Sequence, residues 1–227
     1  MIIRSDFFNA RWAAGLLVVL FIPFYLAPAE VKAADATPQD RVIKKRLAEG
    51  IRLGKDGEYE QAIAEFEEVL KLDPKNVHAL NNIAAAYVKL KDVDKAASYF
   101  TNAIDLGVAN STTYFYRGII FDRHRQDKAK AIKDFSKAIE LDPKFSKAYL
   151  NRALAYSSLK KYDRSIADYN KIVQINPDSL KSIIKYRATA YYKKGDHAKA
   201  WADVETAKKL GVKIDNKFVK KKKKAMQ

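Results

Sequence analysis

The sequence predicts an all-α protein built from repeated pairs of helices. Of its 227 residues, 48% are hydrophobic and 31% charged, which is enough apolar material for a folded core. Only 8 glycines and 6 prolines are present, and helix-forming residues dominate, which argues against a loop-rich β-protein. One stretch also recurs, as KLDPKNVHALNNIAAAY (71–87), KAIELDPKFSKAYLNRALAY (137–156) and QINPDSLKSIIKYRATAY (174–191). Each copy ends one apolar helical pattern near a proline and soon begins another.

Residues 1–33 are predicted to be a signal peptide, followed by a linker over residues 34–42. A charged start precedes an apolar run from Trp12 to Ala29, and small residues follow. The best cleavage site lies after Ala33. The alternative is an uncleaved membrane anchor at 12–29, although this run is slightly shorter than the roughly 20 residues of a spanning helix. We therefore expect an exported protein, either periplasmic or secreted, or one anchored in a membrane.

Five copies of a pattern about 34 residues long fill residues 43–214. Small residues recur at spacings of 34, 34, 35 and 35: Gly50, Ala84, Gly118, Ala153 and Ala188. Three residues after each of them comes a larger apolar or aromatic residue: Leu53, Tyr87, Phe121, Tyr156 and Tyr191. A second small position precedes, by four residues, a second large residue: Phe66, Phe100, Phe135, Tyr169 and Val204. Proline closes three of the copies: Pro74, Pro143 and Pro177.

This pattern resembles the tetratricopeptide repeat, a helix–turn–helix of 34 residues. The resemblance implies a right-handed α-solenoid of five units, at 43–76, 77–110, 111–145, 146–180 and 181–214. Small residues let helices approach, aromatic rings fill the space between them, and proline ends the second helix of a unit. Units two and five lack the proline, so we expect softer boundaries there. Extra residues are expected in the turn of unit three and near Leu180.

An arginine and an aspartate recur together in units three to five. The arginines precede the first small residue and the aspartates follow the second one by three: Arg117, Arg152, Arg187 and Asp134, Asp168, Asp203. At these positions unit one has Glu49 and Glu65, and unit two has Ile83 and Tyr99, so neither shows the pair. This joint presence and absence predicts an ion pair within each of the three units. A basic ladder for a ligand is the alternative.

The resemblance also implies a groove lined by the first helix of each unit. Its positions here carry amide, aromatic and basic groups, which suit an extended peptide or a helix of a partner protein. The candidate partner-binding residues are Asn81, Asn82, Tyr116, Lys147, Asn151, Lys185 and Tyr186. The alternative is that these are solvated polar residues of a helix surface.

A lysine-rich tail occupies residues 215–227. Five consecutive lysines are candidates for contact with an anionic membrane or envelope polymer: Lys220, Lys221, Lys222, Lys223 and Lys224. The alternative is a polar cap on the last unit. The formal net charge of +16 fits an acidic partner without identifying it. Nucleic acid is not expected as a partner, because nothing resembles a base-reading module.

No catalytic residues, cofactor or metal site are predicted. There is no cysteine, the three histidines show no ligand spacing, and phosphate-loop, nucleophile-elbow and zinc-protease motifs are absent. We therefore expect a non-enzymatic scaffold or adaptor of the cell envelope, with docking through the lysine-rich tail as the alternative function.

Overall fold

The computed structural model describes residues 37–214, which form ten α-helices and no strand. The predicted all-α class is confirmed. The first five helices are α1 (Pro38–Asp56), α2 (Tyr59–Leu72), α3 (Val77–Lys89), α4 (Val93–Asp105) and α5 (Ser111–Arg123). The others are α6 (Lys128–Leu141), α7 (Ser146–Ser158), α8 (Tyr162–Ile175), α9 (Leu180–Lys194) and α10 (His197–Lys209), with a 3₁₀ turn, η2 (Pro177–Ser179), before α9.

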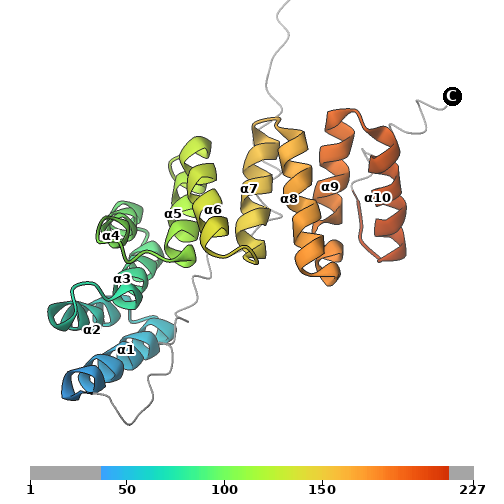
Figure 1. Cartoon of the computed structure of the whole chain (residues 1–227). Coiled ribbons are helices and arrows are strands. Elements are labelled where there is room, and N and C mark those ends of the chain that lie inside the picture. Colours follow the sequence, from blue (N-terminus) through green and yellow to red (C-terminus); the bar gives the residue numbers. More distant parts are fainter. Residues whose placement is uncertain (1–36, 215–227) are drawn as a thin grey trace, which may run out of the picture.

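Successive helices pack in pairs, and the pairs stack along a curved solenoid (Figure 1). We call the pairs units one to five, with odd-numbered helices as A helices and even-numbered ones as B helices. The strongest packing is within a pair, and each B helix also packs against the next A helix. Contacts skip an intervening helix where α1 meets α3 and where α5 meets α7. Each unit thus depends on its neighbours for much of its core.

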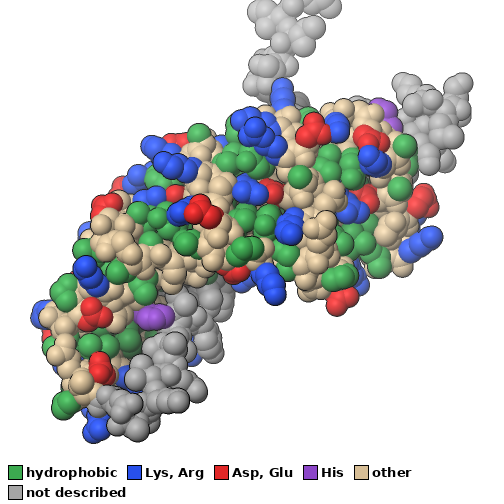
Figure 2. All heavy atoms as spheres, in the orientation of Figure 1, with side chains coloured by type: hydrophobic (Ala, Val, Ile, Leu, Met, Phe, Trp, Pro, Cys, Tyr) green, Lys and Arg blue, Asp and Glu red, His purple; other side chains and the backbone are tan. Residues whose placement is uncertain are grey.

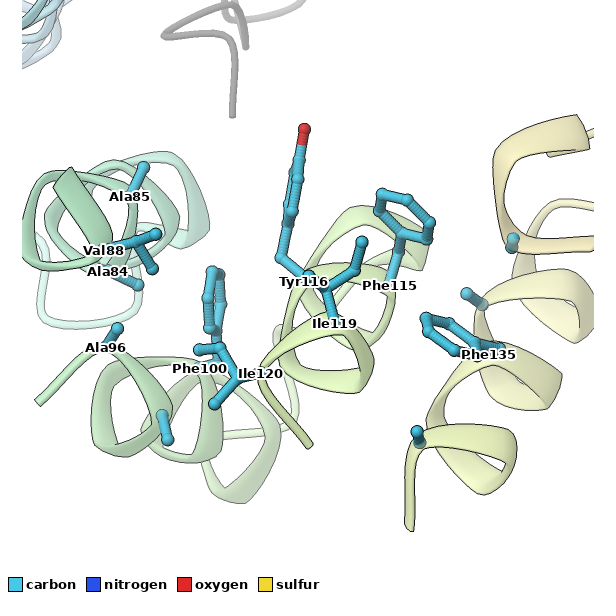
Figure 3. Packing of buried hydrophobic residues seen from close by; sticks show 14 residues of the cluster. Ala84, Ala85, Val88, Ala96, Phe100, Phe115, Tyr116, Ile119, Ile120 and Phe135 are labelled. Carbon is cyan, nitrogen blue, oxygen red and sulfur yellow. The ribbon is translucent and has the colours of Figure 1, made fainter. Parts of the chain in front are cut away.

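Aromatic rings and small residues form the core between the helices in units one to four, and Val204 takes the place of the ring in unit five. Phe66, Phe100, Phe135 and Tyr169 are all fully buried at the second large position of the pattern. Gly118 in α5 shows why a small residue faces the ring: a Cβ there would lie 2.8 Å from Phe135 Cε1. Figure 3 shows Phe100 and Phe135 packed between the helices of this cluster.

The first helix begins earlier than expected. Thr37 caps α1 by accepting a hydrogen bond from the Asp40 amide, and the Asp40 side chain accepts one from the Thr37 amide. Pro38 follows the cap, where its missing N–H is harmless. The linker predicted over residues 34–42 is therefore wrong from residue 38 onward.

Glycine replaces proline at the ends of units two and five. Gly107 and Gly211 adopt left-handed φ values of 72° and 69°. The next amides, of Val108 and Val212, bond back to the carbonyls of Ala103 and Ala207. These are glycine-dependent helix ends, so softer boundaries at these two places were a wrong expectation. The longer turn at 124–127 and the η2 turn confirm the two extra residues.

Within the described range, 37–214, no helix combines the length and apolar character needed to cross a bilayer. The predicted signal peptide, its alternative as an anchor, and the lysine-rich tail lie outside the described residues.

Candidate functional site

Three buried ion pairs join helix A to helix B in units three, four and five. In each, the arginine Nε and Nη2 donate to the two carboxylate oxygens over 2.7–2.9 Å. The pairs are Arg117–Asp134, Arg152–Asp168 and Arg187–Asp203. No arginine side chain among them is more than 18% exposed, and no aspartate side chain more than 8%. The predicted ion pairs are confirmed, and the alternative of an open basic ladder is wrong because the guanidinium groups are engaged.

Each of these arginines also contacts the unit before its own. The Nη1 atom donates to a side-chain oxygen on the preceding B helix over 3.0–3.2 Å. The acceptors for Arg117, Arg152 and Arg187 are Thr101, Ser136 and Asn170. One guanidinium therefore ties three helices together. Sequence reasoning missed these acceptors because they share a repeat position but no residue type.

Unit one links its two helices by an ion pair whose arginine lies at a different repeat position. Arg46, one helical turn before the expected position, pairs with Glu65 at 3.0 Å. The two side chains are 37% and 29% exposed, so solvent screens this pair more than the buried ones. The expectation that unit one lacks such a pair was wrong, because an arginine at i−3 on helix A reaches the same carboxylate.

Burial and pairing act in opposite directions on Asp168. Burial raises the pKa of this carboxyl above 3.8, and Arg152 opposes the shift. Because the pKa of Asp168 is higher in the folded protein than in the unfolded chain, protonation of Asp168 favours the folded state. This contribution to the free energy of unfolding is fully present below about pH 3.8 and is lost as pH rises through the folded-state pKa. At neutral pH the carboxylate is thus held against a burial penalty, and its arginine partner is needed to offset it.

The amino-terminal part of the predicted groove is more enclosed than expected. Asn81 and Asn82 on α3 are 4% and 2% exposed, and Tyr116 on α5 is 9% exposed. The Tyr116 ring stacks on Phe100, with 6.3 Å between centroids, and burial raises the pKa of Tyr116 to about 12. The expectation that these positions are open was wrong, because α3 and α5 approach closely enough for Thr113 to donate to Asn81 Oδ1 at 3.0 Å. Figure 3 shows the Tyr116 hydroxyl pointing away from the core cluster.

Three nitrogen atoms on α3 have no hydrogen-bond partner among the described residues. They are Nδ1 of His78 and the amide nitrogens of Asn81 and Asn82. A buried donor left unsatisfied costs about 1–3 kcal/mol. Burial lowers the pKa of His78, which favours its neutral ring. These groups occupy the helix positions assigned to the groove, and the fold leaves their hydrogen-bonding capacity unused.

The carboxy-terminal part of the predicted groove is accessible. Lys147 and Lys185 are exposed, while Asn151 and Tyr186 are partly buried. The Asn151 amide donates to the Lys147 carbonyl at 2.9 Å, and the Lys185 ammonium lies 4.9 Å from the Tyr186 ring centroid. The Tyr186 ring in turn stacks on Tyr169 of α8. These contacts hold the side chains in defined positions, although a role in binding stays a prediction.

Metal ligands do not cluster in the part of the chain that the structure describes. No group of three or more histidine, cysteine, aspartate or glutamate residues is placed to hold an ion there. The five tail lysines lie outside this part, so their predicted contact with a polyanion stays untested.

Comparison with family models identifies the repeat. Residues 47–110, 123–145 and 146–179 each match a model described as tetratricopeptide repeat. Serine/threonine-protein phosphatase 5 of Rattus norvegicus is 31% identical over 113 residues, which is 50% of this chain and 22% of that protein. DnaJ homolog subfamily C member 7 of Mus musculus is 26% identical over 149 residues, 66% of this chain and 24% of that protein. The chain therefore matches about a quarter or less of these relatives' length.

Solved structures share the architecture. A crystal structure of MamA protein has a TM-score of 0.65 at 24% identity, covering 74% of this chain and 90% of that one. YrrB, described as "a TPR protein with an unusual peptide-binding site", has a TM-score of 0.62 at 17% identity, covering 75% and 91%. At these identities the likeness concerns the fold alone. The family matches and the stacked helix pairs together establish that this chain belongs to the tetratricopeptide repeat family.

Proposed function

We propose that this chain is a non-enzymatic scaffold that holds an extended segment or a helix of a partner protein against its A helices. Membership of the tetratricopeptide repeat family supports a protein-interaction role. The observation that carries the groove proposal is the accessible set Lys147, Asn151, Lys185 and Tyr186 on the A helices α7 and α9, to which the unpartnered amide nitrogen of the enclosed Asn82 adds a donor. A partner's backbone carbonyls are the acceptors that such donors suit.

The two halves of the groove have different tasks in this proposal. The enclosed amides on α3 bind main-chain groups once the partner segment enters between the A helices. The exposed Lys147 and Lys185, with Asn151 and Tyr186 beside them, bind side chains and favour an acidic segment. The neighbouring ion pairs keep the A helices in fixed register, which reduces the ordering cost of binding.

The proposed setting is the cell envelope. The charged start, apolar run and small residues of 1–33 support export, and a retained anchor at 12–29 is the alternative. Sequencing the amino terminus of the mature protein from cells distinguishes the two: a start at Ala34 supports cleavage, and an intact Met1 supports the anchor. Docking through Lys220–Lys224 remains a second candidate, favoured only by the charge of that segment.

The groove proposal is tested by identifying a partner segment and measuring its affinity. Cross-linking in cells with identification by mass spectrometry supplies the segment, which is then synthesised. The variant Asn82→Ala/Asn151→Ala/Tyr186→Ala is expected to bind it at least tenfold more weakly, since each lost contact contributes about 1 kcal/mol. The matched control Lys133→Ala/Lys171→Ala/Lys209→Ala changes exposed residues of B helices. Unchanged affinity in the groove variant, or equal losses in both variants, contradicts the proposal.

A further inference from the structure

A basic notch opens between the A-to-B turns of units four and five. We use this name for the cleft formed by residues 160–164 and Lys193–Lys194, which has a volume of about 330 Å³. It contains five cationic side chains and a single carboxylate, Asp163. Lys194 bonds to that carboxylate at 2.5 Å. The other four cations have no carboxylate partner among residues 37–214: Lys160, Lys161, Arg164 and Lys193.

One of these cations lies at a strained position of the backbone. Lys160 follows Leu159, the C-cap of α7 in unit four, and lies in the left-handed region with φ 59°. At the corresponding turns, Gly57 and Gly195 of units one and five have φ 91° and 95°, and Lys91 and Gln126 of units two and three have φ 64° and 51°. Glycine adopts this conformation freely, whereas a side chain makes it strained. A lysine at this point therefore worsens the turn locally while it adds a charge at the opening of the notch.

Positive charge is concentrated in the half of the solenoid that contains the notch. Residues 111–214 carry 23 lysines and arginines against 11 aspartates and glutamates, whereas residues 37–110 carry 11 against 12. The α5–α6, α7–α8 and α9–α10 turns lie along one edge (Figure 1). Figure 2 shows lysine and arginine side chains gathered along this edge. In unit three, Arg125 and Lys130 are bonded to Asp94 and Asp127, so the cations of the notch come from units four and five alone.

We propose that the basic notch docks this chain on anionic phospholipid, with the headgroup phosphates as its ligands. All five cations are exposed, so the notch is open to a surface. Its cations come from two adjacent units along the turn edge, which suits a surface carrying many phosphates better than a single small anion. Each lysine near an anionic membrane strengthens binding about fivefold. The proposal is independent of the groove, because the notch lies at the turn edge of the solenoid.

The test uses the full chain with two kinds of vesicle, one of phosphatidylcholine alone and one with 30% phosphatidylglycerol. The excess binding to the anionic vesicles is measured by co-sedimentation. The excess binding is expected to fall at least tenfold in the notch variant Lys160→Gln/Lys161→Gln/Arg164→Gln/Lys193→Gln. The control Lys133→Gln/Lys144→Gln/Lys171→Gln/Lys209→Gln removes the same charge from exposed positions elsewhere and is expected to lose less than threefold. Equal losses in the two variants would show non-specific attraction and overturn the proposal.

Three further arms distinguish lipid docking at the notch from turn strain, from docking by the tail and from binding of a different anion. Lys160→Gly relieves the strained turn, so it is expected to keep or raise the thermal midpoint while anionic-vesicle binding falls about fivefold; unchanged binding contradicts the proposal. The notch effect is expected to persist when Lys220–Lys224 are all replaced by glutamine, and its disappearance assigns docking to the tail instead. Release of the bound chain by 10 mM inorganic phosphate at constant ionic strength, or by polyglutamate at equal charge, would indicate a small-anion or acidic-protein site and overturn lipid docking.

Discussion

Units three to five and units one to two join their helices with different chemistry. In the later units a buried arginine bonds bidentately to the aspartate of its own B helix and reaches the preceding B helix as well. In unit one, Arg46 and Glu65 form a partly exposed pair. In unit two, Tyr99 takes the aspartate's place and stacks on Tyr87, with 5.7 Å between centroids. The same backbone arrangement thus accepts either an ion pair or an aromatic stack between helices A and B. The contributions of these contacts to stability can be compared by substitution.

The largest difference is expected from removing one arginine in each region. Arg152→Ala leaves the Asp168 carboxylate buried without its cation, which is expected to lower the free energy of unfolding by about 3–5 kcal/mol. Arg46→Ala breaks a screened pair and is expected to lower it by at most about 1 kcal/mol. Urea denaturation followed by circular dichroism measures both. Equal losses would remove the distinction between the two regions.

A double replacement separates the charge from the shape of the joint. Arg152→Met with Asp168→Leu removes the buried charges together, so it is expected to recover most of the stability lost in Arg152→Ala. A double variant as unstable as the single one would mean that the hydrogen bonds of the pair, including the bond to Ser136, are the larger contribution.

The aromatic packing is expected to behave alike in both regions. A Cβ at Gly50 would lie 2.7 Å from Phe66 Cε1, and one at Gly118 would lie 2.8 Å from Phe135 Cε1. Both rings are fully buried and cannot move away freely. Gly50→Ala and Gly118→Ala are each expected to lower the free energy of unfolding by about 1–3 kcal/mol in the same assay. If one of these substitutions left the free energy of unfolding unchanged while the other lowered it, the two regions would differ in their aromatic core as well as in their ion pairs.

The link between units is expected to contribute less. Ser136→Ala removes the acceptor that Arg152 Nη1 uses on the preceding unit, so a loss of about 1 kcal/mol is expected. Ser98→Ala is the matched control, because that hydroxyl bonds only to the Asp94 carbonyl of its own exposed helix surface. Its effect is expected to be within about 0.5 kcal/mol. Native-state hydrogen exchange in α6 and α7 adds a local measurement, and unchanged exchange in Ser136→Ala contradicts the link.

The smallest effect on stability is expected from removing a helix cap, because its contribution does not depend on the region of the solenoid in which it lies. Asp196 caps α10, and its bond from the Lys199 amide lowers the pKa of this carboxyl below 3.8. Its contribution is therefore present above about pH 3.8 and is lost as pH falls through the folded pKa. Asp196→Ala is expected to lower the thermal midpoint at pH 7, with a difference from the parent chain that shrinks toward pH 2. A difference that is constant with pH would contradict this assignment.

Sequence reasoning predicted the features that depend on repeated residue types. The helix pairs, the aromatic core positions and the ion pairs of units three to five follow from residues that recur in register. Glycine endings at Gly107 and Gly211 were missed because the proline signal was given more weight than the glycine signal. The start of α1 was missed although Thr37 and Asp40 have the spacing of a capping box.

The candidate site was less predictable than the fold. Exposure of Asn81, Asn82 and Tyr116 depends on how closely two A helices approach, and a pattern within one unit does not contain that distance. The basic notch was missed for a related reason. Lys160 lies in the α7–α8 turn and Lys193 near the end of α9, and only the stacking of units four and five brings them to one cleft.

The most direct test of the groove is a map of where the partner touches the solenoid. A photo-cross-linking residue is placed in turn at Lys147, Asn151 and Lys185 on A helices, and at Lys133, Lys171 and Lys209 on B helices. All six variants are irradiated with the same purified partner segment. The groove account predicts cross-links from the A-helix positions and none from the B-helix positions. Cross-links mainly from the B helices would contradict it.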